Sequence, residues 1–307
     1  MAKISILGVS SSGKTCFIYA MSQLLRCGVS SGDNLLQMIS NNSSQQIKLN
    51  NGYLKLIQNR WPQTSDKTEL YDFRVSVRCN GYFNEIISSL EIQDYRGGML
   101  LGDSPTDTDE LDTLMDSFRG SSAIIFIIDG QTLIEALDPS ERDASHRNCG
   151  DITQQFISRS QIELAENIFM KYSKAEEYIP PVIFAISKGD LFASKNEEEC
   201  AMRLIREKIP SIFSIGSGMT AAIVRMSLGE NLGTDSEGGL TGQLNLSEEN
   251  NIHVPVIFGI YSDLCIEYEN SSDSRERDGI MSVLDMMRRF FADRIRLFVS
   301  GKEAIEL

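Results

Sequence analysis

The sequence predicts an α/β fold of three layers, in which helices cover both faces of a mostly parallel sheet with one antiparallel strand. Three observations lead to this fold. Short apolar runs typical of buried strands alternate with amphipathic stretches typical of helices. A loop rich in glycine and serine separates the first of these strands from the first helix. An Asn-Gly pair joins two later strands, which indicates an antiparallel hairpin.

The first strand and the first helix lie at the start of the chain. Residues 3–8 form a short β-rich run, and residues 14–26 form the amphipathic stretch that follows the loop. Residues 28–70 are polar and carry no long strand signal. We therefore expect a long, partly mobile connection there, with a short helix near residues 35–39.

The hairpin and the remaining α/β units follow. Residues 71–79 and 82–94 flank Asn80-Gly81, the pair best suited to a tight turn in which both central residues have positive φ. Further helices are expected at 111–118, 161–178, 197–208 and 278–299. Further strands are expected at 122–129, 181–187, 220–226 and 254–261.

The chain length of 307 residues suits one large α/β domain. We interpret residues 1–307 as a single domain with insertions at about 28–70, 131–155 and 229–251. The last insertion is acidic and rich in Gly, Asn and Ser, which predicts a flexible excursion.

The composition argues against several classes of partner. The formal net charge is −14, whereas nucleic acids and anionic membranes attract basic surfaces. No apolar run is long enough for a membrane helix, and the six cysteines are scattered without a C-x-x-C pair. The two histidines, His146 and His253, are interpreted as surface or capping residues. We expect a cytoplasmic protein that neither binds nucleic acid nor inserts directly into a membrane.

Residues 8–15, Gly-Val-Ser-Ser-Ser-Gly-Lys-Thr, match the phosphate-binding pattern G-x-x-x-x-G-K-[ST]. Gly8 and Gly13 let the loop wrap closely, so that its backbone N–H groups can point at phosphate oxygens. The helix that starts near Lys14 adds the positive end of its dipole. Lys14 can reach the β- and γ-phosphates, and the Thr15 hydroxyl can bind Mg²⁺. The loop therefore predicts a site for a nucleoside triphosphate with Mg²⁺.

Two further motifs follow strands. The sequence Asp-Tyr-Arg-Gly at 94–97 ends the hairpin; a carboxylate there can hold a water of the Mg²⁺ shell, and the Gly97 N–H can reach the γ-phosphate. The sequence Ser-Lys-Gly-Asp at 187–190 follows a buried strand. Asp190 can accept hydrogen bonds from N1–H and the 2-amino group of guanine, a donor pair that adenine lacks. Each motif alone also fits an ordinary turn, but their order after the phosphate loop favours GTP.

The order GVSSSGKT, DYRGG and SKGD, with an antiparallel hairpin before the second motif, resembles the Ras-like (TRAFAC-class) P-loop GTPases. The resemblance runs from Lys3 to the final predicted helix. The insertions and the doubled glycine after Asp94 are most similar to the bacterial GTPases of biological-conflict gene clusters, the double-GTPase-like group. The resemblance implies a Ras-like G domain that binds GTP or GDP with Mg²⁺, hydrolyses GTP slowly and acts as a molecular switch. It also implies a protein effector or a second GTPase subunit as partner.

The resemblance also implies roles for individual residues. The residues that would hold the phosphates are Gly8, Ser10, Ser11, Ser12, Gly13, Lys14, Thr15 and Cys16, with Asp94 and Gly97 at the γ-phosphate. The residues that would contact the base are Ser187, Lys188, Asp190, Ser227 and Leu228. The residues that would ligate Mg²⁺ directly or through water are Thr15, Thr68 and Asp94. The residues that would support hydrolysis are Lys14, Thr15, Thr68 and Gly97.

Two of these assignments have rivals. The switch threonine that ligates Mg²⁺ in the triphosphate state is Thr68 by spacing, and Thr64 is its rival. The last base-contacting loop is placed at residues 227–229, Ser-Leu-Gly, and residues 261–263, Tyr-Ser-Asp, are the alternative.

Departures from the family pattern suggest weaker binding and other functions. Ser187 stands where the family usually has Asn, so we expect the loss of an amide bridge to the phosphate loop and a lower affinity. Gly98 replaces a glutamine and cannot orient a water, so intrinsic hydrolysis should be slow. Arg96 could supply charge to the transition state, although a surface arginine is the commoner case. The rival functions are a GTP-locked subunit that hydrolyses nothing, which Gly98 favours, and a P-loop ATPase, which SKGD and the hairpin disfavour.

Overall fold

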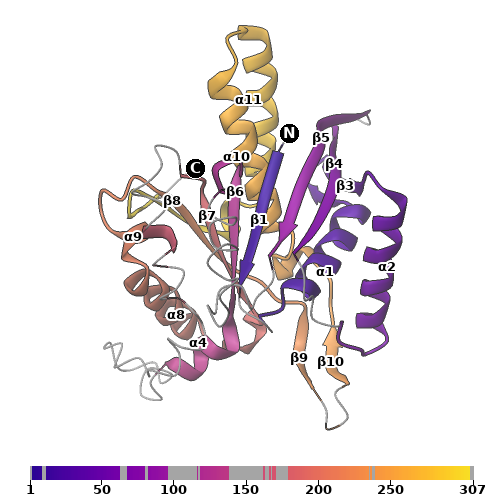
Figure 1. Ribbon diagram of the computed structural model, residues 1–307, viewed down its shortest axis with the longest axis vertical. Helices are drawn as coiled ribbons and strands as arrows, with labels where there is room; N and C mark the ends of the chain where they lie inside the picture. Colours follow the sequence, from indigo (N-terminus) through magenta and orange to yellow (C-terminus); the bar gives the residue numbers. More distant parts are fainter. Residues whose placement is uncertain are drawn as a thin grey trace.

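Apolar strands from the whole length of the chain form the parallel centre of one sheet in the computed structural model (Figure 1). In spatial order these strands are β8 (Thr220–Arg225), β7 (Val182–Ser187), β6 (Ala123–Asp129), β1 (Ala2–Gly8) and β5 (Tyr82–Asp94). Strands β1, β6 and β7 are buried along almost their whole length, as expected for parallel strands covered on both faces. The structure describes residues 2–8, 12–62, 68–79, 82–95, 116, 118–137, 162, 166, 168–170, 179–234, 236 and 239–304.

Both edges of the sheet are antiparallel. Strands β4 (Glu69–Cys79), β3 (Asn34–Ser40) and β2 (Val29–Ser31) extend it beyond β5, and β11 (Arg296–Val299) and β12 (Lys302–Glu303) extend it beyond β8. Within the described residues β4, β2 and β11 run against the parallel set, so the prediction of one antiparallel strand is wrong. Short connections make the pairs β2–β3, β4–β5 and β11–β12 antiparallel, whereas helices lie between the antiparallel partners β3 and β4 and between β8 and β11.

The predicted hairpin is confirmed by the pairing of β4 with β5. Cys79 pairs with Tyr82, so the connection has the two-residue length that the Asn-Gly pair suggests. The turn residues Asn80 and Gly81 themselves lie outside the described residues.

The prediction for residues 28–70 is wrong where the structure describes them. The segment expected to hold a short helix is strand β3, and helix α2 (Ser43–Ile57) follows it. Leu36 and Met38 are buried and alternate with less buried neighbours, which is the period of a strand. The side chain of Asn42 accepts hydrogen bonds from the first turn of α2 and caps the helix. Strand β3 and helix α2 are therefore part of the sheet and of one helical layer.

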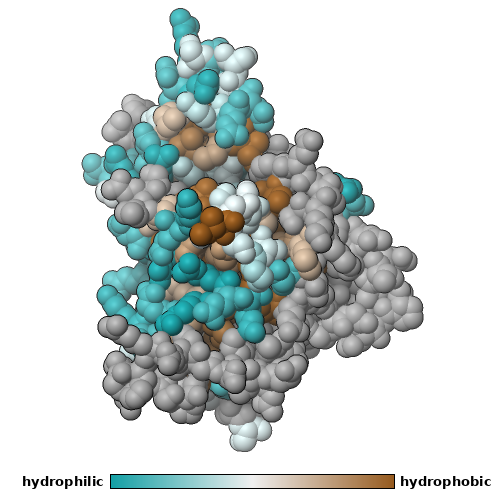
Figure 2. All heavy atoms as spheres, turned by 90° about the vertical axis from the view of Figure 1, so that its left-hand side faces the viewer, coloured by the Kyte–Doolittle hydropathy of each residue, from teal (hydrophilic) through white to brown (hydrophobic). Residues whose placement is uncertain are grey.

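Helices cover both faces of the sheet (Figure 1). Helices α1 (Lys14–Cys27), α2, α10 (Val254–Asn270) and α11 (Ser274–Arg288) supply apolar side chains to one core. Helices α4 (Gly130–Ala136), α8 (Lys195–Lys208) and α9 (Pro210–Phe213) supply them to the other. Figure 2 shows the side of the molecule that lies at the left of Figure 1, where the surface is largely hydrophilic with small hydrophobic patches.

Two predictions for the last part of the chain are wrong. The strand expected at residues 254–261 is the first half of helix α10. This half-helix is buried on all sides, and an unbroken apolar run cannot be assigned to strand or helix by its period alone. The helix expected at 278–299 begins earlier and ends at Arg288, and the chain then forms the strand β11.

Other expected segments are described only in part. The described residues of the helices expected at 111–118 and 161–178 are helical, and the rest of both segments lies outside the described part. The insertion expected at 131–155 begins within α4, and its residues from 138 onward are not described. The flexible excursion expected at 229–251 is instead the hairpin of β9 (Gly229–Thr234) and β10 (Leu240–Leu244). Among the described residues no helix is both long and apolar enough to cross a membrane.

Candidate functional site

The carboxyl ends of the parallel strands meet at one edge of the sheet. The chain passes from β1 to the β4–β5 side and then returns across β1 to β6, β7 and β8. In open α/β sheets, ligands bind outside the carboxyl ends of the strands at such a change of direction. Asp94 ends β5 and pairs with Ile6 of β1, and Asp129 of β6 pairs with Ser187 of β7. The phosphate-loop motif and both later motifs therefore converge at this edge.

The phosphate loop connects β1 directly to α1. A Cβ atom on Gly8 would lie 2.7 Å from the carbonyl oxygen of Ile127, so only glycine fits beside β6 at this position. Gly13 has a φ of 93° and is the N-cap of α1, which the left-handed conformation of a glycine allows. The first N–H groups of a helix have no partner within it, and they form an anion site. Ser10 and Ser11 lie outside the described residues.

Lys14 and Asp94 lie near one another beneath this loop, and both are buried. The Lys14 Nζ atom donates a hydrogen bond to the carbonyl oxygen of Gly8 at 2.6 Å. Burial lowers the pKa of Lys14, and the nearby Asp94 opposes this shift. Burial raises the pKa of the Asp94 carboxyl to about 7, and Lys14 opposes that shift in turn. Two buried oxygens here, Oδ1 of Asp94 and Oγ of Ser12, have no hydrogen-bond partner among the residues that the structure describes.

Charged and phenolic groups from neighbouring elements surround Asp94. Glu69 pairs with Asp94 across β4 and β5, and Lys48 of α2 forms an ion pair with Glu69 at 2.7 Å. Tyr71 donates a hydrogen bond to Glu69, and burial with this bond raises the Tyr71 pKa. Glu69 lies at the start of β4, outside every motif of the sequence, and was therefore not predicted. Thr68 directly precedes Glu69 and is exposed, whereas its rival Thr64 is not described.

Two other predicted residues flank this part of the site. Thr15 is half-buried in the first turn of α1, and Cys16 beside it is buried. Burial raises the pKa of the Cys16 thiol to about 12, so the thiol stays protonated, and any contact with phosphate would come from its backbone N–H. Arg96, Gly97 and Gly98 lie outside the described residues.

Ser187 bridges the third motif to the phosphate loop. Its hydroxyl lies 2.9 Å from the carbonyl oxygen of Ser12 and 3.1 Å from that of Ile128, and donates to one of them at a time. The amide bridge expected to be lost here is therefore replaced by a hydroxyl bridge, and the lower affinity stays a prediction. The Ser12 carbonyl lies close enough to the end of β7 for a short hydroxyl side chain to reach it.

Lys188 is held by the end of β6. It has a φ of 52°, and its Nζ atom forms an ion pair with Asp129 at 2.9 Å. The start of α4 lies close to the end of β7, since a Cβ atom on Gly130 would lie 2.2 Å from the carbonyl oxygen of Ser187. Asp129 was not predicted as a site residue, although an aspartate at the end of a buried strand is a position typical of ligand contacts.

Asp190 lies within hydrogen-bond distance of the loop after β8 and of strand β9. The Ser227 hydroxyl lies 2.7 Å from Oδ1 of Asp190, and the backbone N–H of Asn231 donates to Oδ2 at 3.2 Å. The Gly189 N–H also donates to the carbonyl oxygen of Met226 at 2.9 Å, which joins the two loops directly. Leu228 is half-buried and packs against the core. Asn231 had no signal in the sequence, because its contribution is a backbone group.

The alternative loop at residues 261–263 is not at this edge. Tyr261, Ser262 and Asp263 belong to helix α10, and Asp263 contacts Ser122 just before the amino end of β6. The structure therefore brings Ser227, and not this segment, to Asp190.

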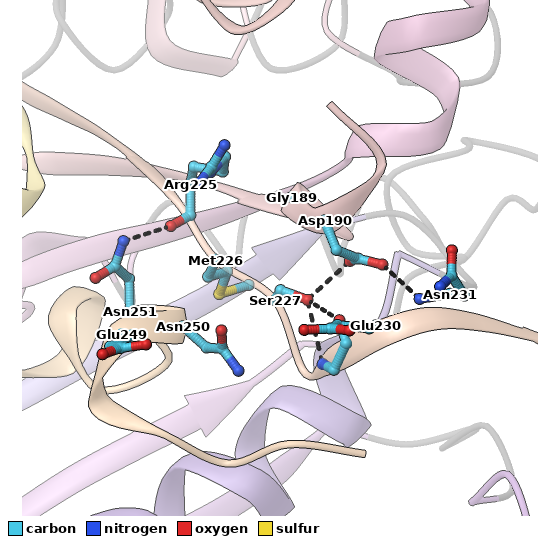
Figure 3. Close-up of a pocket in the computed structure, with 11 residues that line it drawn as sticks. Gly189, Asp190, Arg225, Met226, Ser227, Glu230, Asn231, Glu249, Asn250 and Asn251 are labelled. Atoms are coloured by element: carbon cyan, nitrogen blue, oxygen red, sulfur yellow. Dashed lines mark hydrogen bonds between the residues drawn. The ribbon is translucent and has the colours of Figure 1, made fainter. Parts of the chain in front are cut away.

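A polar pocket of about 360 Å³ opens beside Asp190 (Figure 3). Asp190 and Asn231 lie on one side of it, Glu249 and Asn251 lie on the other, and Ser227 lies between them. The pocket is lined mainly by carboxylates, amides and backbone groups, which can read the polar edge of a ligand.

Comparisons with known proteins add little beyond the fold. No model of a known protein family matches this chain, and no curated protein matches it. One similar solved structure is that of the small COPII coat GTPase SAR1 of Encephalitozoon cuniculi, an ADP-ribosylation factor-like GTP-binding protein in complex with GDP. It is 12% identical over 68% of this chain and 60% of that chain, with a TM-score of 0.31.

A second similar structure is a glycine-to-serine variant of SsGBP. It is 14% identical over 74% of this chain and 50% of that chain, with a TM-score of 0.35. The matched part is less than two thirds of either protein's length. Likeness at this level says nothing about the ligand or the activity of this chain.

Proposed function

We propose that this protein binds GTP with Mg²⁺, hydrolyses it slowly, and acts as a molecular switch of the Ras-like P-loop class. The observation that supports this most is the convergence of three motifs at one edge of the sheet: the loop at 8–15, Asp94 at the end of β5, and the turn at 187–190. The Ser187 hydroxyl joins the last of these to the first. One ligand with phosphates at one end and a base at the other would contact all three.

The phosphates would lie against the loop and the amino end of α1. Gly8 and Gly13 let the backbone approach, and the first-turn N–H groups of α1 face the anion. Lys14 now bonds to the Gly8 carbonyl and would transfer to the β- and γ-phosphates. Fixed positive groups of this kind stabilise the charge on a transferring phosphoryl group.

The residues near Asp94 fit a magnesium ion that arrives with a nucleotide. Asp94 offers a buried oxygen that has no hydrogen-bond partner among the described residues, while Thr15 lies in the first turn of α1 and Thr68 directly precedes β4. Within the described part of the chain no group of three His, Cys, Asp or Glu side chains could hold a metal alone. Mg²⁺ commonly takes one or two protein ligands and completes its shell with phosphates and waters. Bound there, it would neutralise charge on the phosphates.

The base would be read by Asp190, with the Lys188 stem across its plane. A carboxylate accepts from the N1–H and 2-amino groups of guanine, whereas adenine presents no such donor pair to it. Ser227 keeps the carboxylate in place from the next loop. In the triphosphate state the γ-phosphate would order residues 60–70 and 94–105, and a protein effector or a second GTPase subunit would read this change.

Competition binding tests the proposal. Unlabelled GTP and ATP compete against a fluorescent guanine nucleotide in the presence of Mg²⁺. We expect GTP to win by more than about a hundredfold, because a buried polar site rejects a ligand that leaves its groups unpaired. Asp190→Asn should lose this preference, since an amide NH₂ would face the guanine donors.

The matched control is Asp33→Asn, which changes an exposed aspartate in the β2–β3 turn and should leave the preference intact. Equal competition by ATP, or an unchanged preference in Asp190→Asn, would reduce the 187–190 motif to an ordinary turn.

A second candidate is a GTP-locked interaction subunit, which Gly98 favours because glycine has no side chain to orient water. Single-turnover hydrolysis of pre-bound GTP separates the two functions. Release of phosphate that is abolished in Lys14→Ala supports a GTPase. Intact GTP after hours at saturation supports the locked subunit.

A further inference from the structure

The β9–β10 hairpin contacts the segment after helix α2. The N–H of Leu240 donates to the carbonyl oxygen of Asn59, just after α2, at 2.9 Å, and Leu240 is buried. At the other end of the hairpin, the N–H of Asn245 donates to the carbonyl oxygen of Leu228 at 2.9 Å, which extends the pairing of its two strands by one residue pair. In Figure 1 the hairpin extends below α1, next to the lower end of α2. The hairpin therefore extends from the end of α2 to Asp190, the residue proposed to read the nucleotide base.

A β-bulge interrupts this hairpin beside Asp190. Thr241 pairs with Gly233 and Gln243 pairs with Glu230, so Asn231 and Leu232 together face the single residue Gly242. Asn231 has a φ of 53° and Gly242 a φ of 88°. A Cβ atom on Gly242 would lie 2.4 Å from the carbonyl oxygen of Asn231. Bulges re-aim groups beside functional sites, and this one requires glycine at Gly242.

The bulge directs a backbone donor out of the hairpin. The Asn231 N–H points to Oδ2 of Asp190 at 3.2 Å, and the Ser227 hydroxyl lies at Oδ1 (Figure 3). A carboxylate has about four acceptor sites. The Asn231 N–H occupies one, and the Ser227 hydroxyl, which also lies 2.6 Å from the Gly229 carbonyl oxygen, can donate to a second, so two sites remain open. The two open acceptor sites of Asp190 match the N1–H and 2-amino donors of guanine.

We propose that the β9–β10 hairpin sets the base specificity of the nucleotide site by holding Asp190 in place. Asn231 and Gly242 are positioning residues: the bulge holds the Asn231 N–H, and that N–H orients the carboxylate. The inference rests on the proposed role of Asp190 in reading guanine. It adds an element outside the three motifs, which acts on selectivity between bases and not on phosphate binding.

The test measures base selectivity in Gly242→Ala. The added Cβ would meet the Asn231 carbonyl, and alanine resists a positive φ, so the bulge rearranges and the N–H leaves Asp190. We expect the preference for GTP over ATP, and for GTP over ITP, which lacks the 2-amino group, to fall by about tenfold. The affinity for inorganic triphosphate with Mg²⁺ should stay at the wild-type value, because the phosphate loop is untouched.

A second pair of variants acts from the opposite strand. Asn231→Val places a β-branched residue where φ is positive, and it should lose selectivity as Gly242→Ala does. Its conservative counterpart, Asn231→Gly, keeps the N–H and the left-handed conformation and should retain selectivity. The matched control is Gly233→Ala in the same hairpin, where the added Cβ meets only the Thr241 hydroxyl, at 3.1 Å.

The outcomes separate this inference from the proposed function. If Asp190→Asn loses the preference for GTP while Gly242→Ala and Asn231→Val both keep it, the hairpin does not set specificity and the guanine site stands. If Asp190→Asn also keeps the preference, the role of Asp190 is wrong and this inference fails with it. A loss of triphosphate affinity in the same proportion as GTP affinity would show a general structural effect and would overturn the inference.

Discussion

At the scale of single residues, the candidate site depends on short polar contacts between strand ends. Ser187 reaches the Ser12 carbonyl, Lys188 reaches Asp129, and Ser227 reaches Asp190. Each contact joins segments that are far apart in the sequence. Each contact therefore fixes the position of one strand end relative to another.

The Ser187 bridge gives the first prediction at this scale. Ser187→Ala removes the hydroxyl that joins the base-side turn to the phosphate loop. A hydrogen bond of this kind contributes about 1 kcal/mol, so we expect GTP affinity to fall roughly fivefold. Titration with a fluorescent guanine nucleotide measures this. The control is Ser22→Ala, which removes a buried hydroxyl whose bond to the Tyr19 carbonyl lies within α1, and which should leave affinity unchanged.

His253 gives a prediction about pH. The sequence predicts a surface or capping residue, but His253 is only 1% exposed. It occupies the N-cap position of α10, yet its side chain forms no capping hydrogen bond. Burial, together with Arg294, lowers its pKa from 6.5 to about 4. The folded protein therefore keeps the imidazole neutral in a range where the unfolded chain takes up a proton.

The stability that His253 contributes is complete above pH 6.5 and is lost as the pH falls toward 4. The loss should reach about 2–3 kcal/mol at pH 4.5. Denaturant unfolding at several pH values measures it, with His253→Gln to separate this group from the carboxylates. Equal slopes of unfolding free energy against pH in the two proteins would contradict the assignment.

At the scale of elements, the packing of α2 on α1 shows how local sequence fixes an interface. Gly52 of α2 lies against the Tyr19 ring of α1, where an added Cβ atom would come within 2.4 Å. We expect Gly52→Ala to destabilise the protein by about 1–3 kcal/mol through overpacking.

The matched control for this interface is Gly279→Ala in helix α11, where an added Cβ atom meets nothing within 4 Å. It should stabilise the protein by about 0.5–1 kcal/mol, because alanine favours a helix more than glycine does. Thermal unfolding of both variants shows whether Gly52→Ala lowers and Gly279→Ala raises the stability of the protein. Stabilisation of similar size in both variants would mean that Gly52 of helix α2 does not pack on Tyr19 as described.

The elements also show what could be predicted from sequence. Central strands such as 122–129 and 181–187 were found because both of their faces are buried, and the hairpin was found through its turn residues. Strand β3 was missed because its apolar residues alternate over only a few positions among polar neighbours. Helix α10 was taken for a strand because its first half is buried all round, which removes the helical period.

At the scale of the whole molecule, the topology brings the motifs together. The motifs themselves were visible in the sequence, as was their place at strand ends. The contacts made by Glu69, Asp129 and the Asn231 N–H were not visible in the sequence. Strand pairing places Glu69 beside Asp94, the ends of β6 and β7 bring Asp129 to Lys188, and the bulge in β9 places the Asn231 N–H beside Asp190. Such contacts follow from three-dimensional packing and leave no local pattern.

We propose that one guanine nucleotide with Mg²⁺ spans the edge where these motifs meet. The most direct measurement is a calorimetric titration of GTP into the purified protein, with Mg²⁺ and again with EDTA. We predict one site per chain, much tighter binding with Mg²⁺, and no binding by Lys14→Ala. The absence of any heat of binding at GTP concentrations up to about 1 mM, or equal binding by Lys14→Ala, would contradict the account.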